Sequence, residues 1–264
     1  MKTRVISGIM MAPLLLILYF RGFVLMAACA VVGIIGAKEF FSGWEALGVK
    51  PSKKIAYVSA AVLYIATVLE LTSNEFIMFW LVASIVAAMM YGWNITDRGP
   101  YDAMATVLGV VYVVFFSYHM VLIDQTNYGI LIWLVCLSAF GSDVMAYFTG
   151  YLIGKHKLCP NLSPKKTIEG AVGGVVGAGL LCGLFGFFFA RDILIHTVII
   201  GVIGGAISQA GDLTASAFKR KMGIKDYGNL IPGHGGIMDR FDSVIFVAPF
   251  IYYYIWGVFG MLGL

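Results

Sequence analysis

The amino-acid sequence predicts an all-α, polytopic integral membrane protein built as a helical bundle. Of its 264 residues, 60% are hydrophobic and only 12% are charged, which is more apolar surface than a soluble domain of this length could cover. Apolar stretches of roughly 20 residues, long enough to cross a hydrocarbon core, follow one another almost from end to end. These stretches do not alternate apolar and polar residues as barrel strands would, so helices are expected to satisfy the backbone in lipid.

Nine membrane-spanning helices are expected in chain order, and the connections between them carry almost every charge. The first apolar stretch is interpreted as an uncleaved helix and not as a signal peptide, because apolar segments continue after it. The four cysteines lack C-x-x-C spacing and are expected to be small buried hydrophobes, without a disulfide framework or a zinc site. The expected spans are 5–20, 22–38, 55–71, 76–92, 103–123, 129–153, 170–190, 193–218 and 243–262.

The positions of lysine and arginine predict an N-in, C-out orientation. With the N-terminus in the cytoplasm, all of the 18 basic residues except Arg21 and Arg191 fall at cytoplasmic ends and loops, as expected for loops that stay on that side. The chain is then divided into five N-terminal helices (1–128), a scaffold with possible dimer contacts, and four C-terminal helices (129–264). The second group is expected to be catalytic, with cytoplasmic loops at 154–170 and 219–242.

Polar side chains interrupt the later spans. Asp143 has apolar residues on both sides in the sixth span, and a carboxylate within a membrane helix is a functional candidate because it is costly unless it faces protein, water or a cation. In the eighth span, Gln209, Asp212, Ser216 and Lys219 are spaced i, i+3, i+7 and i+10. This spacing predicts one polar stripe on a helix, running from a buried carboxylate to a cationic end.

Glycine spacing predicts that the seventh and eighth spans approach their neighbours closely. Pairs of glycines separated by three residues let helix backbones pack in contact. The pairs are Gly170 with Gly174, Gly173 with Gly177, and Gly201 with Gly205.

The most polar stretch, "SAFKRKMGIKDYGNLIPGHGGIMDRFDS", runs from Ser216 to Ser243. Pro232 and several glycines predict an irregular loop, and glycines on both sides of His234 can bring backbone N–H groups close to an anion, as in phosphate-binding nests. Asp239 and Asp242 follow at i, i+3 on the expected first turn of the ninth span, where their carboxylates can converge.

These residues predict a site for a metal-bound polyphosphate. The carboxylates of Asp212, Asp239 and Asp242 suit a hard cation, magnesium above all, and the lack of clustered histidine or cysteine argues against zinc. The surrounding cations suit phosphate oxygens. They are Lys219, Arg220, Lys221, Lys225 and Arg240. Phosphoryl and nucleotidyl transfer require mainly positioning and charge neutralisation from the protein, so this chemistry is expected.

The same stretch resembles the signature of the phosphatidate cytidylyltransferases, or CDP-diacylglycerol synthases. The matching positions are Ser216, Lys219, Arg220, Lys225, Asp226, His234, Gly235, Gly236, Asp239, Arg240 and Asp242. Upstream, "SDVMAYFTGYLIGKHKLCPNLSPKKTIEGAVGG" is similar to a second region of that family, so the likeness covers residues 138–243. The first five helices share only the family's general character, with "GAKEFF" at Gly36 to Phe41 in a plausible place.

The resemblance implies that CTP and phosphatidate react to give CDP-diacylglycerol and pyrophosphate, with the active site on the cytoplasmic face of an inner membrane. It also implies magnesium, a second cation such as potassium, a homodimer, and no nucleic-acid partner. Asp212, Asp239 and Asp242 are the expected metal ligands, and His234 is expected to seat a phosphate or protonate pyrophosphate. The residues expected at the substrate phosphates are Lys166, Ser216, Lys219, Arg220, Lys225, Asp226, Gly235, Gly236 and Arg240, with Asp143 lining the cavity.

Three alternatives stay open from the sequence. A CTP-dependent lipid kinase of the dolichol kinase kind, or a cytidylyltransferase acting on an archaeal ether lipid, would need similar surroundings for CTP. A phosphate or ion transporter would also contain buried aspartates and glycine-rich helices. Transporters of this kind commonly have inverted repeats with broken helices in both halves, whereas the polar features here lie in the second half.

Overall fold

A computed structural model describes residues 12–230 and 235–263, and the regular secondary structure within them is helical apart from one two-stranded hairpin. The predicted all-α class is therefore confirmed. Among the described residues, 7 helices are long and apolar enough to cross a membrane. The predicted nine spans and their orientation stay predictions, because the first span falls partly on residues outside the described range, and α4 (Lys53–Val68) has 16 residues.

The chain forms two compact units, and the segment that joins α10 to α11 returns to the first of them. One unit is Met1–Val121 with Lys221–Arg240, and the other is Leu122–Arg220 with Phe241–Leu264. The predicted division into residues 1–128 and 129–264 stays a prediction. In the structure, Lys221–Arg240 belongs to the same compact unit as the N-terminal helices, a relationship that local sequence patterns do not encode.

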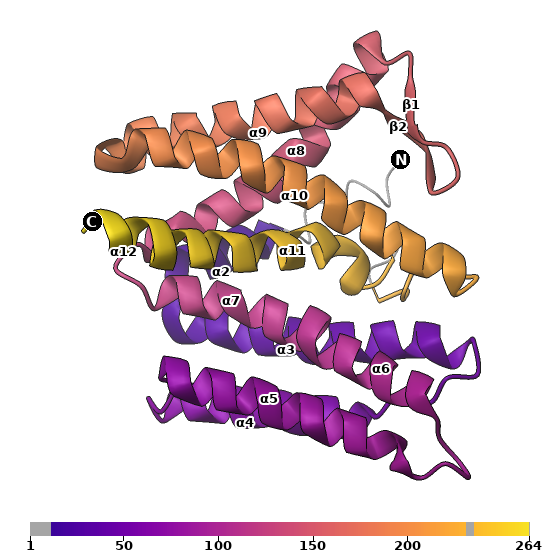
Figure 1. Ribbon diagram of the computed structural model, residues 1–264. Helices are drawn as coiled ribbons and strands as arrows, with labels where there is room; N and C mark the ends of the chain where they lie inside the picture. The colour runs from indigo at the N-terminus through magenta and orange to yellow at the C-terminus, as the bar shows by residue number, and fades with distance from the viewer. Residues whose placement is uncertain (1–11, 231–234, 264) are drawn as a thin grey trace. The chain divides into compact units, whose positions relative to one another are not determined.

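In the first unit, α3 packs against residues 109–115, the middle of the long helix Pro100–Asp124 (Figure 1). Phe41 of α3 occupies the space beside Gly109, where a Cβ atom would collide with its ring. The ring of Phe40 meets that of Tyr112 edge-on, with centroids 5.6 Å apart. The elements of this unit are α2 (Ala12–Phe20), α3 (Gly22–Glu45), α4 (Lys53–Val68), α5 (Asn74–Met90), η1 (Tyr91–Trp93), α6 (Pro100–Leu108), the π-helical η2 (Gly109–Phe115) and α7 (Phe116–Asp124), which ends in the second unit.

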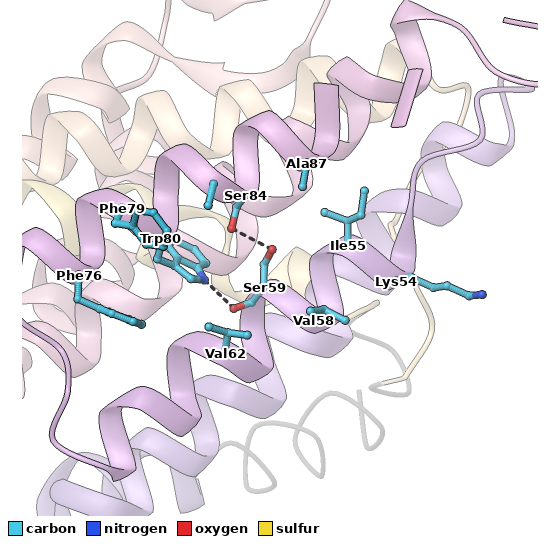
Figure 2. Close-up of a pocket in the computed structure, with 11 residues that line it drawn as sticks. Lys54, Ile55, Val58, Ser59, Val62, Phe76, Phe79, Trp80, Ser84 and Ala87 are labelled. Atoms are coloured by element: carbon cyan, nitrogen blue, oxygen red, sulfur yellow. Dashed lines mark hydrogen bonds between the residues drawn. The ribbon is translucent and has the colours of Figure 1, made fainter. Parts of the chain in front are cut away.

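An apolar groove of about 350 Å³ lies between α4 and α5 (Figure 2). The polar groups beside it pair with one another, since Ser59 Oγ donates to Ser84 Oγ at 3.0 Å and Trp80 Nε1 donates to the Ser59 carbonyl at 2.8 Å. The groove is lined by Lys54, Ile55, Val58, Ser59, Val62, Phe76, Phe79, Trp80, Ala83, Ser84 and Ala87. It contains none of the predicted site residues, so it is not the predicted substrate site.

The second unit is organised by close packing of α8, α9 and α10 (Figure 1). A Cβ atom on Gly174 of α9 would lie 2.8 Å from the Ser142 carbonyl oxygen of α8, and one on Gly201 of α10 would lie 2.6 Å from the Ala178 carbonyl oxygen of α9. The predicted close helix crossings are confirmed. The helices are η3 (Gly129–Leu131), α8 (Ile132–Ile153), α9 (Ile168–Phe189), η4 (Arg191–Ile193), α10 (Leu194–Lys221), α11 (Met238–Tyr254), the π-helical η5 (Ile255–Phe259) and α12 (Gly260–Leu262).

The predicted basic loop at 154–170 contains an antiparallel hairpin of β1 (Lys157–Cys159) and β2 (Ser163–Thr167). Glu169, in the first turn of α9, closes the base of this hairpin. Its carboxylate accepts a hydrogen bond from the Lys155 backbone at 3.0 Å and pairs with His156 Nδ1 at 2.6 Å. Thr167 caps α9 by accepting a hydrogen bond from the Gly170 backbone at 3.1 Å. The hairpin therefore has a fixed connection to the helix that follows it.

Two helix boundaries differ from the prediction in ways that affect the site. Helix α3 continues past the predicted end at residue 38 to Glu45, and α11 begins at Met238, ahead of the predicted start at 243. Glu39 is consequently a helical residue. Asp239 and Asp242 lie on the first turn of α11, as their spacing predicted.

Candidate active site

The second unit brings five of the predicted site residues into one electrostatic cluster. Lys166, on β2, forms an ion pair with Asp212 on α10, and each side chain is about a quarter exposed. The carboxylate of Asp242, on α11, is buried and interacts electrostatically with Asp212, Lys219 and Asp143. Three carboxylates and two ammonium groups thus converge from α8, β2, α10 and α11. A polar cluster of this size inside an apolar bundle is typical of a functional site.

Helix α10 is held in register with α8 and α9 by Gln209, which is part of the predicted polar stripe. Its side-chain amide donates to the Ala171 carbonyl at 2.8 Å and to Ser142 Oγ at 3.2 Å. A side chain at Gly174 would collide with this amide. Asp212 lies one turn further along α10, so the hydrogen bonds of Gln209 fix the helix that presents Asp212.

Helix α11 approaches α10 at a glycine. A Cβ atom on Gly211 would lie 2.9 Å from the Cβ atom of Phe246 and 3.2 Å from the Asp242 carbonyl oxygen. The side chain of Asp242 also accepts a hydrogen bond from the Ser243 backbone at 2.7 Å. The close approach explains how two aspartates from separate helices come to interact.

Asp239 bridges two parts of the segment that joins α10 to α11, within the first unit. Its Oδ2 atom accepts hydrogen bonds from the backbone of Tyr227 at 2.8 Å and of Gly236 at 3.0 Å. Gly235 has a φ of +86°, a conformation that favours glycine, and a Cβ there would lie 2.9 Å from Asp239 Oδ2. The unit boundary falls after Arg240, so Asp239 is described with the first unit and Asp242 with the second.

Arg240 supplies a donor without a partner in the described part of the chain. Its Nε atom is buried and makes no hydrogen bond there, an arrangement that is costly unless a ligand accepts the bond. A phosphate oxygen is a suitable acceptor for a guanidinium donor. The orphaned donor is therefore consistent with the predicted role of Arg240 at a phosphate group.

The remaining predicted residues are less closely associated with these clusters. Ser216 is half-buried on α10, and Arg220, near the end of the same helix, is exposed. Lys225 and Asp226 are exposed in the first unit. His234 lies outside the described residues, so its predicted role stays a prediction.

The carboxylates of the cluster have the ligand chemistry of the predicted magnesium site. Carboxylate oxygens are the ligands that magnesium prefers, and Asp212 and Asp242 offer them in the second unit. In residues 12–230 and 235–263, no group of three or more His, Cys, Asp or Glu side chains is already arranged to hold a metal. Asp212 is instead paired with Lys166. The ligand chemistry fits magnesium, and the assignment stays a proposal.

Glu39 is a buried acidic residue near the loop that the sequence analysis did not single out. It lies on α3, and its Oε2 atom accepts a hydrogen bond from the Met238 backbone at 2.8 Å. The available signal was an acidic residue inside an apolar span, within "GAKEFF". The predicted end of that span at residue 38 placed Glu39 in a connection, where a carboxylate needs no special explanation.

The fold and site together define an integral membrane protein whose polar cluster combines carboxylates and cations suited to phosphate groups. The model of the cytidylyltransferase family matches residues 2–258 of the chain. The chain belongs to this family, and the predicted family and enzyme class are confirmed.

Curated relatives match over most of the chain. A phosphatidate cytidylyltransferase of Staphylococcus haemolyticus is 31% identical over 95% of this chain and 97% of its own length. One from Synechocystis is 32% identical over 96% of this chain and 95% of its own length. One from Bacillus subtilis is 36% identical over a shorter stretch, 64% of this chain and 65% of its own length. The likeness therefore includes the N-terminal helices, where the sequence analysis found only general resemblance.

Proposed function

We propose that the protein transfers the cytidylyl group of CTP to phosphatidate, giving CDP-diacylglycerol and pyrophosphate. The observation that carries this proposal is the cluster of Asp212, Asp242, Lys166 and Lys219 within a membrane-embedded unit. Phosphatidate keeps its acyl chains in lipid and brings a phosphate to the membrane surface, whereas CTP arrives from water. A polar site carried by apolar helices suits this pair of substrates, and the family membership supports the reaction.

In the proposed reaction, an oxygen of the phosphatidate phosphate attacks the α-phosphorus of CTP. A new P–O bond forms between lipid and nucleotide, the bond from the α-phosphorus to the bridging oxygen breaks, and pyrophosphate leaves with that electron pair. A phosphomonoester has a second pKa of about 6, so the nucleophile is largely dianionic at neutral pH and needs no strong base. The protein has mainly to orient two anions and neutralise their charge.

The cations of the cluster have separate parts in this scheme. Lys166 and Lys219 would neutralise phosphate oxygens from β2 and α10. The Nε atom of Arg240, which has no partner among the described residues, would donate to a further oxygen. Arg220, Lys225, Ser216 and Asp226 retain their predicted places around the phosphates. Gly235 and Gly236 retain their predicted places at the substrate phosphates, and His234 retains its predicted role of seating a phosphate or protonating pyrophosphate.

Magnesium is proposed as the resident cation, held by Asp212 and Asp242, with Asp239 as the third ligand predicted from the sequence and a monovalent cation such as potassium as the second ion. When bound, magnesium would neutralise the nucleotide phosphates and polarise the reacting phosphorus. With Asp212 holding the metal, Lys166 would be available to neutralise a substrate phosphate.

The cellular setting follows from the charge distribution and the family resemblance. We propose an inner-membrane location with the site facing the cytoplasm, because nearly all basic residues fall on one side of the predicted topology. A homodimer is proposed from the resemblance, and no nucleic-acid partner is expected. Molecular mass measured by light scattering of the detergent-solubilised protein, corrected for detergent, would test the dimer.

A single assay separates this enzyme from the transporter alternative. Purified protein in detergent is incubated with phosphatidate, magnesium and CTP, and both pyrophosphate and a cytidine-containing lipid are measured. The proposal predicts that the two products form in equal amounts and only when both substrates are present. Absence of both products, together with phosphate flux in vesicles containing the protein, would favour a transporter.

A further inference from the structure

The carboxylate of Glu39 holds the start of α11 from a helix that lies far away in the sequence. Its Oε2 atom accepts a hydrogen bond from the backbone of Met238, the first residue of α11, at 2.8 Å. Only 9% of Glu39 is exposed. The first backbone N–H groups of a helix have no partner within the helix, and a carboxylate stabilises them through the hydrogen bond and the helix dipole. Glu39 therefore acts as a cap for α11 supplied from α3.

Two glycines of the stretch from Ser216 to Ser243, here called the signature segment, pack directly against the same carboxylate. A Cβ atom on Gly228 would collide with Glu39 Oε1, and one on Gly236 would collide with Glu39 Oε2. Any larger residue at either position would displace Glu39 from Met238. The sequence predicts that glycines of this segment let the backbone approach a phosphate. Gly228 and Gly236 have a second role, because they leave room for the buried carboxylate of Glu39.

Asp239 is a second carboxylate that holds the same segment. It accepts hydrogen bonds from Tyr227 and Gly236, as described above, while Phe40 of α3 packs against Tyr227 with ring centroids 6.0 Å apart. Tyr227 and Gly236 lie on the two limbs of the segment. Glu39 and Asp239 together fix the backbone of both limbs and the first turn of α11. That turn carries Arg240, whose buried Nε lacks a partner in the described residues.

A role in stability alone explains these contacts less well. Burial of a carboxylate is costly, and an apolar residue facing an apolar helix would pack without that cost. Among the described residues, hydrogen bonds from the backbone of Ile237 and Met238 offset part of this cost, and both donors lie at the start of α11. The contacts of Glu39 thus act on the backbone conformation of the signature segment.

We propose that Glu39 is a positioning residue for the active site, acting through the backbone of Gly228, Gly236 and Met238. The proposal rests on the proposed function, since it assigns Glu39 to the placing of groups that would contact the substrate phosphates. It also gives the first unit a part in catalysis, because α3 fixes the conformation of the segment that carries Asp239 and Arg240.

The test compares Glu39→Gln and Glu39→Ala in the purified full-length protein. Glutamine keeps a hydrogen-bond acceptor of the same size, so kcat should stay within about threefold of the wild-type value. Alanine removes the acceptor, so kcat should fall by roughly 100-fold, as expected for a misplaced catalytic segment. Because nucleotide contacts remain, KM for CTP should change by no more than about threefold in either variant.

Two control variants separate positioning from general stability. Glu45→Gln changes an exposed glutamate on the same helix, one that pairs with Lys53 at 2.8 Å, and should leave kcat unchanged. Thr67→Val removes the buried hydrogen bond to Tyr118 in the same unit, a contact of 2.7 Å. It should lower thermal stability while kcat, measured below the unfolding temperature, is retained.

Hydrogen–deuterium exchange supplies a readout that does not depend on activity. Peptides containing Tyr227, Gly236 and Met238 should exchange faster in Glu39→Ala, and at the wild-type rate in Glu39→Gln. Wild-type kcat in Glu39→Ala would overturn the proposal, as would equal loss of activity in both Glu39 variants, which would assign the charge itself a chemical role. If the wild-type protein made no cytidine-containing lipid, the proposed reaction would fail, and unchanged exchange in Glu39→Ala would separately overturn the positioning role.

Discussion

Lys166 and Asp212 form an ion pair that joins the hairpin of the second unit to α10. The hairpin is fixed at its base by Glu169, and α10 is fixed by Gln209, so both partners are presented by anchored elements. Asp212 in turn interacts with Asp242, which extends the relationship to α11. This pair connects the upstream region that resembles the cytidylyltransferases to the helix that leads into Ser216.

Replacement of Lys166 by alanine should reduce kcat/KM for CTP by roughly 100-fold, because a charge-assisted contact to phosphate is lost. Its neighbour Lys165 is exposed on the same strand, and Lys165→Ala should retain activity. Steady-state rates at varied CTP concentration measure both effects. Equal activity in the two variants would remove Lys166 from the site.

The coupling between Lys166 and Asp212 should make their effects non-additive. Each single variant, Lys166→Ala and Asp212→Asn, disrupts the same pair, so the double variant should lose less activity than the product of the two single losses. A double-mutant cycle on kcat/KM measures this interaction. Strict additivity would indicate that the ion pair has no part in turnover.

Asp242→Asn should abolish measurable turnover, because the amide removes the charge that is proposed to hold magnesium while it preserves the shape of the side chain. Asp192→Asn, in the short helix η4 before α10, is the matched control and should behave as the wild type. Turnover is measured across a magnesium titration. Recovery of activity by high magnesium would still support the metal role, whereas wild-type turnover at every concentration would contradict it.

Arg240→Lys should raise KM for one substrate by roughly 10-fold or more, since lysine keeps the charge but lacks the guanidinium Nε that is buried without a partner in the described chain. Arg191→Lys is the control. Arg191 is exposed, and its Nε donates to the Phe187 carbonyl at 2.8 Å. KM values for CTP and phosphatidate, measured separately, show which phosphate Arg240 contacts. Unchanged KM values for both would argue against a substrate contact.

Much of this architecture was predictable from local patterns. Hydropathy predicted helices that overlap the observed ones, and glycine spacing predicted the contacts of Gly174 and Gly201. The i, i+3 spacing of Asp239 and Asp242 placed both on one helical turn. These features depend on residues close together in the sequence, so periodicity and spacing are sufficient to reveal them.

The contacts of Glu39 could not be predicted in the same way. They join α3 to residues near the opposite end of the chain, and one sequence contains no information on which distant backbone a carboxylate will meet. The ion pair of Lys166 with Asp212 was missed for the same reason, although both residues had been assigned to the site. The hairpin was missed because "SPKKT" combines proline and lysines, which disfavour strands in sequence-based prediction.

The close packing of α8, α9 and α10 predicts that Gly174→Leu lowers stability. The added side chain would collide with Gln209 and Ser142, and overpacking of this kind costs about 1–3 kcal/mol. Gly260→Leu is the control, because a Cβ atom there meets nothing within 4 Å. Thermal unfolding in detergent should show a lower midpoint for Gly174→Leu alone. Equal midpoints for the two variants would contradict the described helix contact.

The position of a radioactive label tests the central claim most directly. CTP labelled with ³²P at the α-phosphate or at the γ-phosphate is supplied with phosphatidate to the purified protein, and the lipid product is extracted and counted. Cytidylyl transfer predicts that the α-label enters the lipid while the γ-label leaves as pyrophosphate. Entry of the γ-label into the lipid, with the α-label remaining in water-soluble nucleotide, would contradict the account and indicate a CTP-dependent lipid kinase.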